Sequence, residues 1–143
     1  MIDSYRKFAP KSQISVVDAS MNAAALAAIA GDTSKCSAIV VAAFATVAAY
    51  RGGVGLNGEL TPFIANLEEG PVPVAIVAMG NPYLLSAFPK TAAYLATFSS
   101  TPPSEASAVK ALFGEIAVSG HLPVTIPGFA KYGDGIQMPA RSR

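Results

Sequence analysis

Short runs of apolar residues recur along this chain and alternate with alanine-rich or amphipathic stretches, and this alternation predicts strands and helices in turn. An apolar run of about four to eight residues, bounded by polar residues, Gly or Pro, is typical of a strand buried on both faces of a parallel sheet. The last such run lies between prolines, which suit the edge of a sheet. The sequence predicts strands at residues 14–17, 37–43, 72–79, 93–98 and 122–126.

Helix-forming stretches lie between these runs. An alanine-rich stretch stops at Gly31, and a second stretch tolerates Pro62 because proline is compatible with the first turn of a helix. Ser104 begins a third stretch with a favourable capping sequence. The predicted helices are residues 22–30, 60–67, 82–88 and 104–113.

The order of these elements predicts an α/β fold, in which a mainly parallel sheet carries helices on both faces as a three-layer sandwich. A chain of 143 residues fits one domain, so we expect residues 1–143 to form a single unit with a frayed tail at 138–143. Ligands of such sheets bind beyond the carboxyl ends of the strands. The predicted ends are Asp18, residues 44–51, residues 80–83 and residues 98–100.

Composition narrows the classes of partner. Hydrophobic residues make up 52% of the chain and charged ones 13%, which predicts a surface that a partner or a second copy covers in part. The net charge of +1 and the scattered Lys and Arg argue against nucleic acid. The apolar run at residues 38–50 is too short to span a membrane, and the first residues carry no signal-peptide pattern. We expect a soluble protein that is not exported, of unknown compartment.

The reactive residues are few. Cys36 is the single cysteine and His121 the single histidine, so an internal disulfide and a Cys-based zinc site are excluded, and no carboxylate spacing indicates another metal. Residues 53–58 match the glycine pattern of dinucleotide-binding loops. Pro62 interrupts the helix that would follow, and the next strand ends without the acidic residue that would bind a ribose. We therefore expect a flexible surface loop and no cofactor, with nucleotide binding as the alternative.

Candidate catalytic groups are limited in the same way. A serine hydrolase would need His121 as its base, with Asp134 as the acid that orients it. The sequence around His121 lacks the nucleophile elbow of such enzymes, so a turn or surface role is the ordinary expectation. Asp18 and Glu59 are the carboxylates expected nearest the crevice, and we interpret both as structural.

Three residues are candidates for substrate binding. Asn81 and Tyr83 directly follow a predicted buried strand, where an amide and a phenol ring could hydrogen-bond and stack on a sugar. The alternative is a proline-containing turn that starts a helix. Arg51 ends the stretch that follows another predicted strand, and we include it as the third candidate.

Three motifs in the last third of the chain point to a family. They are Ala-Leu-Phe-Gly-Glu at residues 111–115, Gly-His-Leu-Pro-Val-Thr-Ile-Pro at 120–127 and Gly-Asp-Gly at 133–135. From residue 14 to residue 137 the chain resembles the α/β-sandwich domain that follows the catalytic barrel in glycoside hydrolase family 3. The bacterial β-N-acetylglucosaminidase-like branch is the most similar.

The resemblance implies an accessory role. The family's nucleophilic aspartate lies on the barrel, so no residue of this chain matches it. Plant-type members carry their acid/base glutamate in a Gly-Glu pair after a strand, and this chain has Ala43 and Phe44 there. In the acetylglucosaminidase branch a barrel-loop histidine does that work, and His121 belongs to a different motif. The resemblance implies a structural or glycan-contacting domain of a β-N-acetylglucosaminidase-like or β-glucosidase-like enzyme, without the catalytic nucleophile or acid/base.

The resemblance also implies a gap in the sheet. Residues 2–9 look like the helix that follows the first strand of the family's sandwich, and that strand is lacking. Unpaired strand edges and apolar side chains would be exposed there. We therefore expect a homo-oligomer, a changed strand order or a catalytic barrel domain as partner. The alternative function is a small esterase-like hydrolase with a site around His121 or at a subunit interface.

Overall fold

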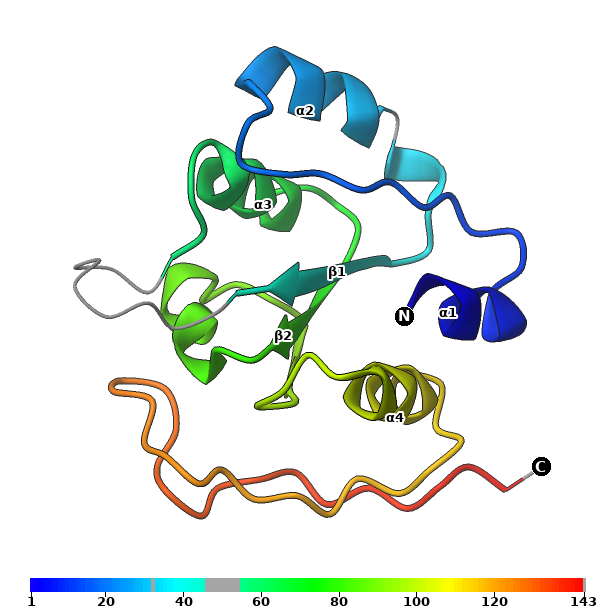
Figure 1. Ribbon diagram of the computed structural model, residues 1–143, viewed down its shortest axis with the longest axis vertical. Helices are drawn as coiled ribbons and strands as arrows, with labels where there is room; N and C mark the ends of the chain where they lie inside the picture. The colour runs from blue at the N-terminus through cyan, green and yellow to red at the C-terminus, as the bar shows by residue number, and fades with distance from the viewer. Residues whose placement is uncertain (32, 46–54, 143) are drawn as a thin grey trace.

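The fold is organised around three parallel strands in the order β1-β2-β3. The computed structural model describes residues 1–31, 33–45 and 55–142. Strand β1 spans Ile39–Phe44, β2 spans Val74–Met79 and β3 spans Ala93–Ala96. Both neighbouring pairs run parallel, so the prediction of an α/β fold with a parallel sheet is confirmed. Figure 1 labels β1 and the central strand β2.

Helices connect and cover the strands (Figure 1). The helices are α1 (Ile2–Phe8), α2 (Ala23–Ala30), α3 (Leu60–Glu68) and α4 (Pro102–Leu112), with short 3-10 helices η1 (Thr33–Lys35) and η2 (Pro82–Ala87). The side chain of Asn22 accepts a hydrogen bond from the Ala25 amide at the start of α2, and Gly31 ends it with φ of 53°. Helix α4 begins two residues before the predicted Ser104, because two prolines occupy its first turn, where no amide partner is needed.

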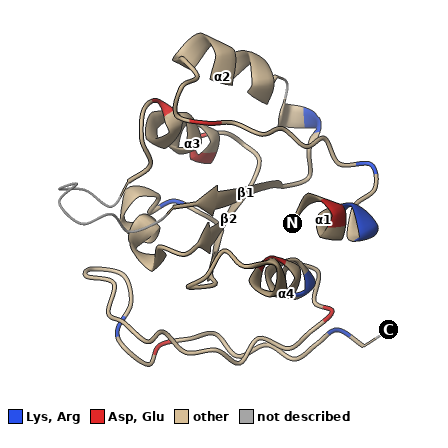
Figure 2. Ribbon diagram, viewed as in Figure 1, with Lys and Arg blue, Asp and Glu red and all other residues tan. Residues whose placement is uncertain are grey.

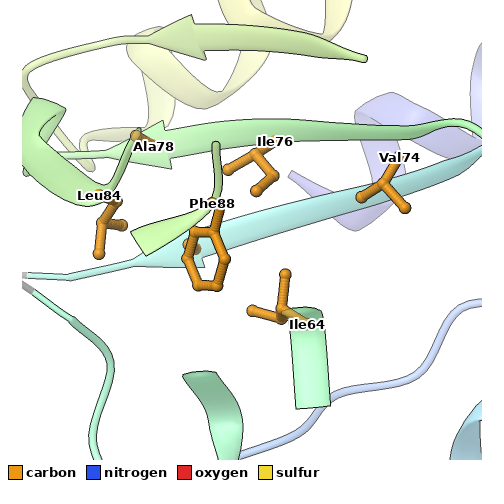
Figure 3. Close-up of a cluster of buried hydrophobic side chains, with 7 residues drawn as sticks. Ile64, Val74, Ile76, Ala78, Leu84 and Phe88 are labelled. Atoms are coloured by element: carbon orange, nitrogen blue, oxygen red, sulfur yellow. The ribbon is translucent and has the colours of Figure 1, made fainter. Parts of the chain in front are cut away.

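Strand β2 divides the buried side chains between its two faces. Val74, Ile76 and Ala78 pack with Ile64 of α3 and with Leu84 and Phe88 from and after η2 (Figure 3). The intervening residues Val77 and Met79 pack on the other face with Ala108 of α4. Side chains alternate along a strand, so a strand covered on both faces needs apolar residues at every position. This is the reason that the apolar run predicted β2 correctly.

The strand predicted at residues 14–17 is wrong. These residues form an unpaired connection between α1 and α2, and 72% of Val16 is exposed. Asp18 therefore does not lie at the end of a strand; its carboxylate accepts hydrogen bonds from the amide and hydroxyl of Ser20, which lower its pKa. β-Branched residues favour an extended backbone, but only pairing with a neighbour makes that backbone a strand.

The strand predicted at residues 122–126 is also wrong. These residues belong to an extended segment, residues 116–141, which we call the C-terminal arm and which folds back on itself (Figure 1). Backbone hydrogen bonds join Val118 to Met138, Leu122 to Gly133 and Asp134, and Ile126 to Ala130. The chain reverses directly after Ile126, so its nearest partner is its own return segment, which costs little loop-closure entropy.

The end of the arm is tied to the rest of the chain. The amide of Arg141 donates to the Gly114 carbonyl over 2.8 Å, and the amide of Met138 donates to the Val118 carbonyl over 2.9 Å. Fraying at residues 138–143 stays a prediction, but these two hydrogen bonds are what fraying would break.

Replacing Phe88 by alanine tests the core assignment. Phe88 is fully buried among residues of β2 and α3, so we expect Phe88→Ala to lower the free energy of unfolding by about 3–5 kcal/mol. The exposed Val16 is the control, and Val16→Ala should change the free energy by less than about 0.5 kcal/mol. Urea unfolding followed by circular dichroism measures both. A large decrease in the free energy of unfolding of Val16→Ala would contradict the exposed connection and indicate a packed segment at residues 14–17.

Candidate functional site

The carboxyl ends of the three strands meet at one edge of the sheet. Phe44 of β1 pairs with Met79 of β2, and Ala78 of β2 pairs with Ala96 of β3. The three strands therefore end side by side. Gly80 continues from β2 with φ of 107°, and a Cβ atom there would lie 2.9 Å from the Ala45 carbonyl oxygen. Glycine is therefore required where these two backbones pass. The candidate binding residues Asn81 and Tyr83 follow β2 at this edge.

Asn81 and Tyr83 form the best-defined part of this edge. The side-chain oxygen of Asn81 accepts a hydrogen bond from the Tyr83 amide over 3.0 Å and so caps η2, with Pro82 in the first turn. Asn81 is 4% exposed, whereas Tyr83 is half-buried. The proline-containing turn that the sequence offered as the alternative is present, and it leaves Tyr83 as the more accessible residue for a ligand.

Tyr94 of β3 holds this turn in place. Its hydroxyl donates to the Pro82 carbonyl over 2.8 Å. Burial raises the pKa of Tyr94 to about 12, an effect that a backbone hydrogen bond at Leu85 opposes. The sheet thus fixes η2 through a half-buried phenol that stays protonated over the ordinary pH range.

A shallow apolar hollow lies beside Tyr83. It has a volume of about 340 Å³ and is lined by Tyr83 and Ser86 of η2 and by Ile126 and Pro127 at the tip of the arm. The Ser86 hydroxyl is engaged with the Tyr83 carbonyl over 2.7 Å. Because its lining is apolar and carries an aromatic ring, the hollow suits the apolar face of a sugar better than a charged ligand.

A second hollow was not foreseen from the sequence. It has a volume of about 400 Å³ and lies between the end of β3, α4 and the start of the arm. Thr97, Ser104, Ser107 and Ser119 contribute hydroxyl groups, and Thr97 already donates to the Ser99 carbonyl over 2.6 Å. Three successive segments within residues 95–120 line it. The only sequence signal was the expectation that residues 98–100 would lie near a binding edge.

His121 and Asp134 lie in the arm and bind its backbone. The Nδ1 atom of His121 is 2.8 Å from the Gly133 carbonyl oxygen, and the Asp134 carboxylate accepts from the Lys131 amide over 2.7 Å. Both side chains are exposed. These contacts stabilise the outgoing and returning segments of the arm, and no hydrogen bond joins His121 to Asp134.

Of the remaining candidate residues with an ionisable side chain, the structure describes Asp18 and Glu59. Arg51 lies outside the described residues, as do Gly53 and Val54 at the start of the glycine pattern. Asp18 binds Ser20, and Glu59 precedes α3 as an exposed residue without a side-chain cap. Both therefore agree with the structural interpretation of these carboxylates.

The described part of the molecule shows no concentrated charge. Basic and acidic side chains are spread singly over its helices, loops and arm (Figure 2). Within residues 1–31, 33–45 and 55–142, no group of three His, Cys, Asp or Glu residues is arranged to hold a metal ion. No described helix has the length and apolar character that crossing a membrane requires.

Replacing Tyr94 by phenylalanine tests its role at this edge. We expect Tyr94→Phe to lose about 1 kcal/mol of stability at neutral pH, since the Pro82 carbonyl loses its donor. In the wild type the unfolded chain releases the Tyr94 proton near pH 10 and the folded chain near pH 12, so this contribution is complete below pH 10 and is lost as the pH rises to 12. Tyr94→Phe should remove that part of the pH dependence. Urea unfolding at pH 8 and pH 11 measures it, with Tyr132→Phe as an exposed control.

Comparison with known proteins finds no match: no family model, no curated protein and no solved structure is similar to this chain.

Proposed function

We propose that this chain is an accessory α/β domain of the kind found in glycoside hydrolase family 3, with a structural or glycan-contacting role. Its partner enzyme would be β-N-acetylglucosaminidase-like or β-glucosidase-like. The chain itself lacks the barrel nucleophile and has Phe44 where plant-type members have an acid/base glutamate. The observation that carries the proposal is the series of three motifs at residues 111–115, 120–127 and 133–135.

The three motifs all contribute to the packing of the arm. A Cβ atom on Gly135 would lie 2.2 Å from the Gly120 carbonyl oxygen, so the second and third motifs touch through glycine backbones. His121 adds its contact to the Gly133 carbonyl. Gly114 of the first motif has φ of 71°, and a Cβ there would meet the side chain of Arg141. Gly114 and Gly133 have a positive φ, and Gly135 makes a close backbone approach, so the backbone favours glycine at these three motif positions for structural reasons.

The hollow beside Tyr83 supports glycan contact. An exposed aromatic edge next to apolar side chains can stack on the C–H face of a pyranose, and N-acetyl groups add a methyl that prefers apolar surroundings. The hollow offers no carboxylate at its wall. It is therefore suited to hold a sugar and not to cleave its bond, which agrees with an accessory role.

The purified chain should not hydrolyse sugars by itself. We expect no turnover of chromogenic N-acetylglucosaminide or glucoside above a buffer blank, because a glycosidase needs two placed carboxyl groups. A short-chain ester should also remain intact, since His121 and Asp134 bind backbone groups. Ester turnover that His121→Ala abolishes would contradict the accessory role and establish the hydrolase alternative.

Tyr83 should dominate any glycan binding. We expect N-acetylglucosamine oligosaccharides to bind weakly, and Tyr83→Ala to weaken the binding at least about ten-fold, which corresponds to 1.4 kcal/mol. Tyr83→Phe should retain most of the affinity because the ring persists. Tyr132→Ala removes an exposed tyrosine from the arm and is the matched control. Titration calorimetry or chemical-shift mapping measures the change, and equal effects of Tyr83→Ala and Tyr132→Ala would count against this hollow.

A further inference from the structure

We propose that β1 pairs antiparallel with β1 of a second copy of this chain, across a two-fold axis perpendicular to the sheet, so that the two sheets become continuous. The proposal rests on the free edge of β1 and is independent of the proposed glycosidase role.

The backbone of β1 has one open side. Its hydrogen bonds to β2 begin with the Ile39 amide donating to Pro73 and end with the Ala45 amide donating to Met79. In a parallel ladder every second residue faces the neighbouring strand, so residues 39, 41, 43 and 45 face β2. The amides and carbonyls of Val40, Ala42 and Phe44 therefore face outward, and no described strand lies on that side.

This edge lacks the features by which proteins prevent edge pairing. Strand β1 contains no charged residue, proline or glycine over its six residues. The opposite edge, β3, has four residues and is preceded by Pro89 and Lys90. A short edge strand next to a charged residue pairs poorly with a strand of another molecule. Strand β1 has neither feature and is open to such pairing. Pairing with a second copy also brings no like charges together, because β1 contains no charged residue.

Symmetry fixes the register of the pairing. A two-fold axis perpendicular to the sheet keeps the α3 faces of both copies on one side, so residues of the same face must lie opposite each other. Pairing all three outward residues then requires that Ala42 face its own copy. Val40 lies opposite the partner's Phe44, and Phe44 opposite the partner's Val40. Each of these pairs can exchange two backbone hydrogen bonds.

This register accounts for the exposure of Phe44. Phe44 is 54% exposed although it is in register with Met79, which is buried. Val40, on the same face, packs against the cluster of Val77, Met79 and Ala108. In the dimer each Phe44 ring would cover the partner's Val40, and an aromatic and a β-branched residue opposite each other stabilise a sheet.

The exposed area of the chain is sufficient for such an interface. The isolated chain exposes 8953 Å², whereas a compact monomer of its mass exposes roughly 6,900 Å². A stable interface buries about 800 Å² of each partner. The excess of about 2,000 Å² therefore leaves room for a second copy at β1 and for a further contact elsewhere.

Charge placed at Ala42 tests the dimer. We expect the wild type to have twice the 14.6 kDa mass of the chain in size-exclusion chromatography with light scattering. Ala42→Lys puts two like charges opposite each other and should weaken dimerisation at least about ten-fold. Ala93→Lys places the same charge on the exposed residue at the other edge of the sheet and should remain dimeric. A monomeric wild type at about 100 μM, or equal dissociation of the two variants, would overturn the proposal.

Cross-linking tests the register without adding charge. In the proposed pairing the two Ala42 Cα atoms are about 5.5 Å apart, within reach of a disulfide or a short bis-thiol reagent. Ala42→Cys in a Cys36→Ser background should give a covalent dimer, and Ala93→Cys in the same background should not. The cross-linking comparison tests the dimer even if Ala42→Lys fails to fold. A covalent dimer formed equally by both cysteines, or by neither, would contradict this register.

Discussion

Burial of β2 on both faces is the constraint on which the rest of the structure depends. Ile76 and Val77 are adjacent in sequence and fully buried, one against α3 and η2 and the other against α4. A strand in this position must have a neighbour on each side to satisfy its backbone, and β1 and β3 provide them. The parallel direction of all three strands then places their carboxyl ends at one edge, where the candidate binding residues gather.

The polar groups at that edge make hydrogen bonds within the fold. Asn81 caps η2, Gly80 lets the chain pass close to Ala45, and the hydroxyl of the half-buried Tyr94 binds the Pro82 carbonyl. A site built in this way is rigid, which suits the holding of a ligand. The described residues that line the hollow beside Tyr83 include no carboxylate.

The arm provides a second surface beside the sheet. It exposes large apolar side chains, among them Tyr132, Ile136 and Met138, and its outgoing and returning segments approach closely at Gly120 and Gly135. Surfaces of this kind are costly in water and are commonly covered by a partner. The dimer proposed above uses β1 and not the arm.

Much of the fold could be predicted from local patterns. The apolar runs gave β1, β2 and β3 within two residues at nearly every boundary, and Asn22, Gly31 and Pro62 marked helix ends through backbone chemistry that does not depend on distant residues. The same patterns failed at residues 14–17 and 122–126. There the extended backbone was compatible with a strand, but no strand of the sheet was available to pair with it.

The sequence by itself determined the α/β class, the buried central strand and the turn that presents Tyr83, because apolar periodicity and the chemistry of Gly, Asn and Pro act over a few residues. Only the tertiary structure decided that residues 122–126 pair with their own return segment, that His121 binds the Gly133 carbonyl, and that β1 lies at an open edge. Each of these depends on which distant segments meet. Contacts between distant segments are set by the packing of the whole chain and cannot be predicted from any short stretch of it.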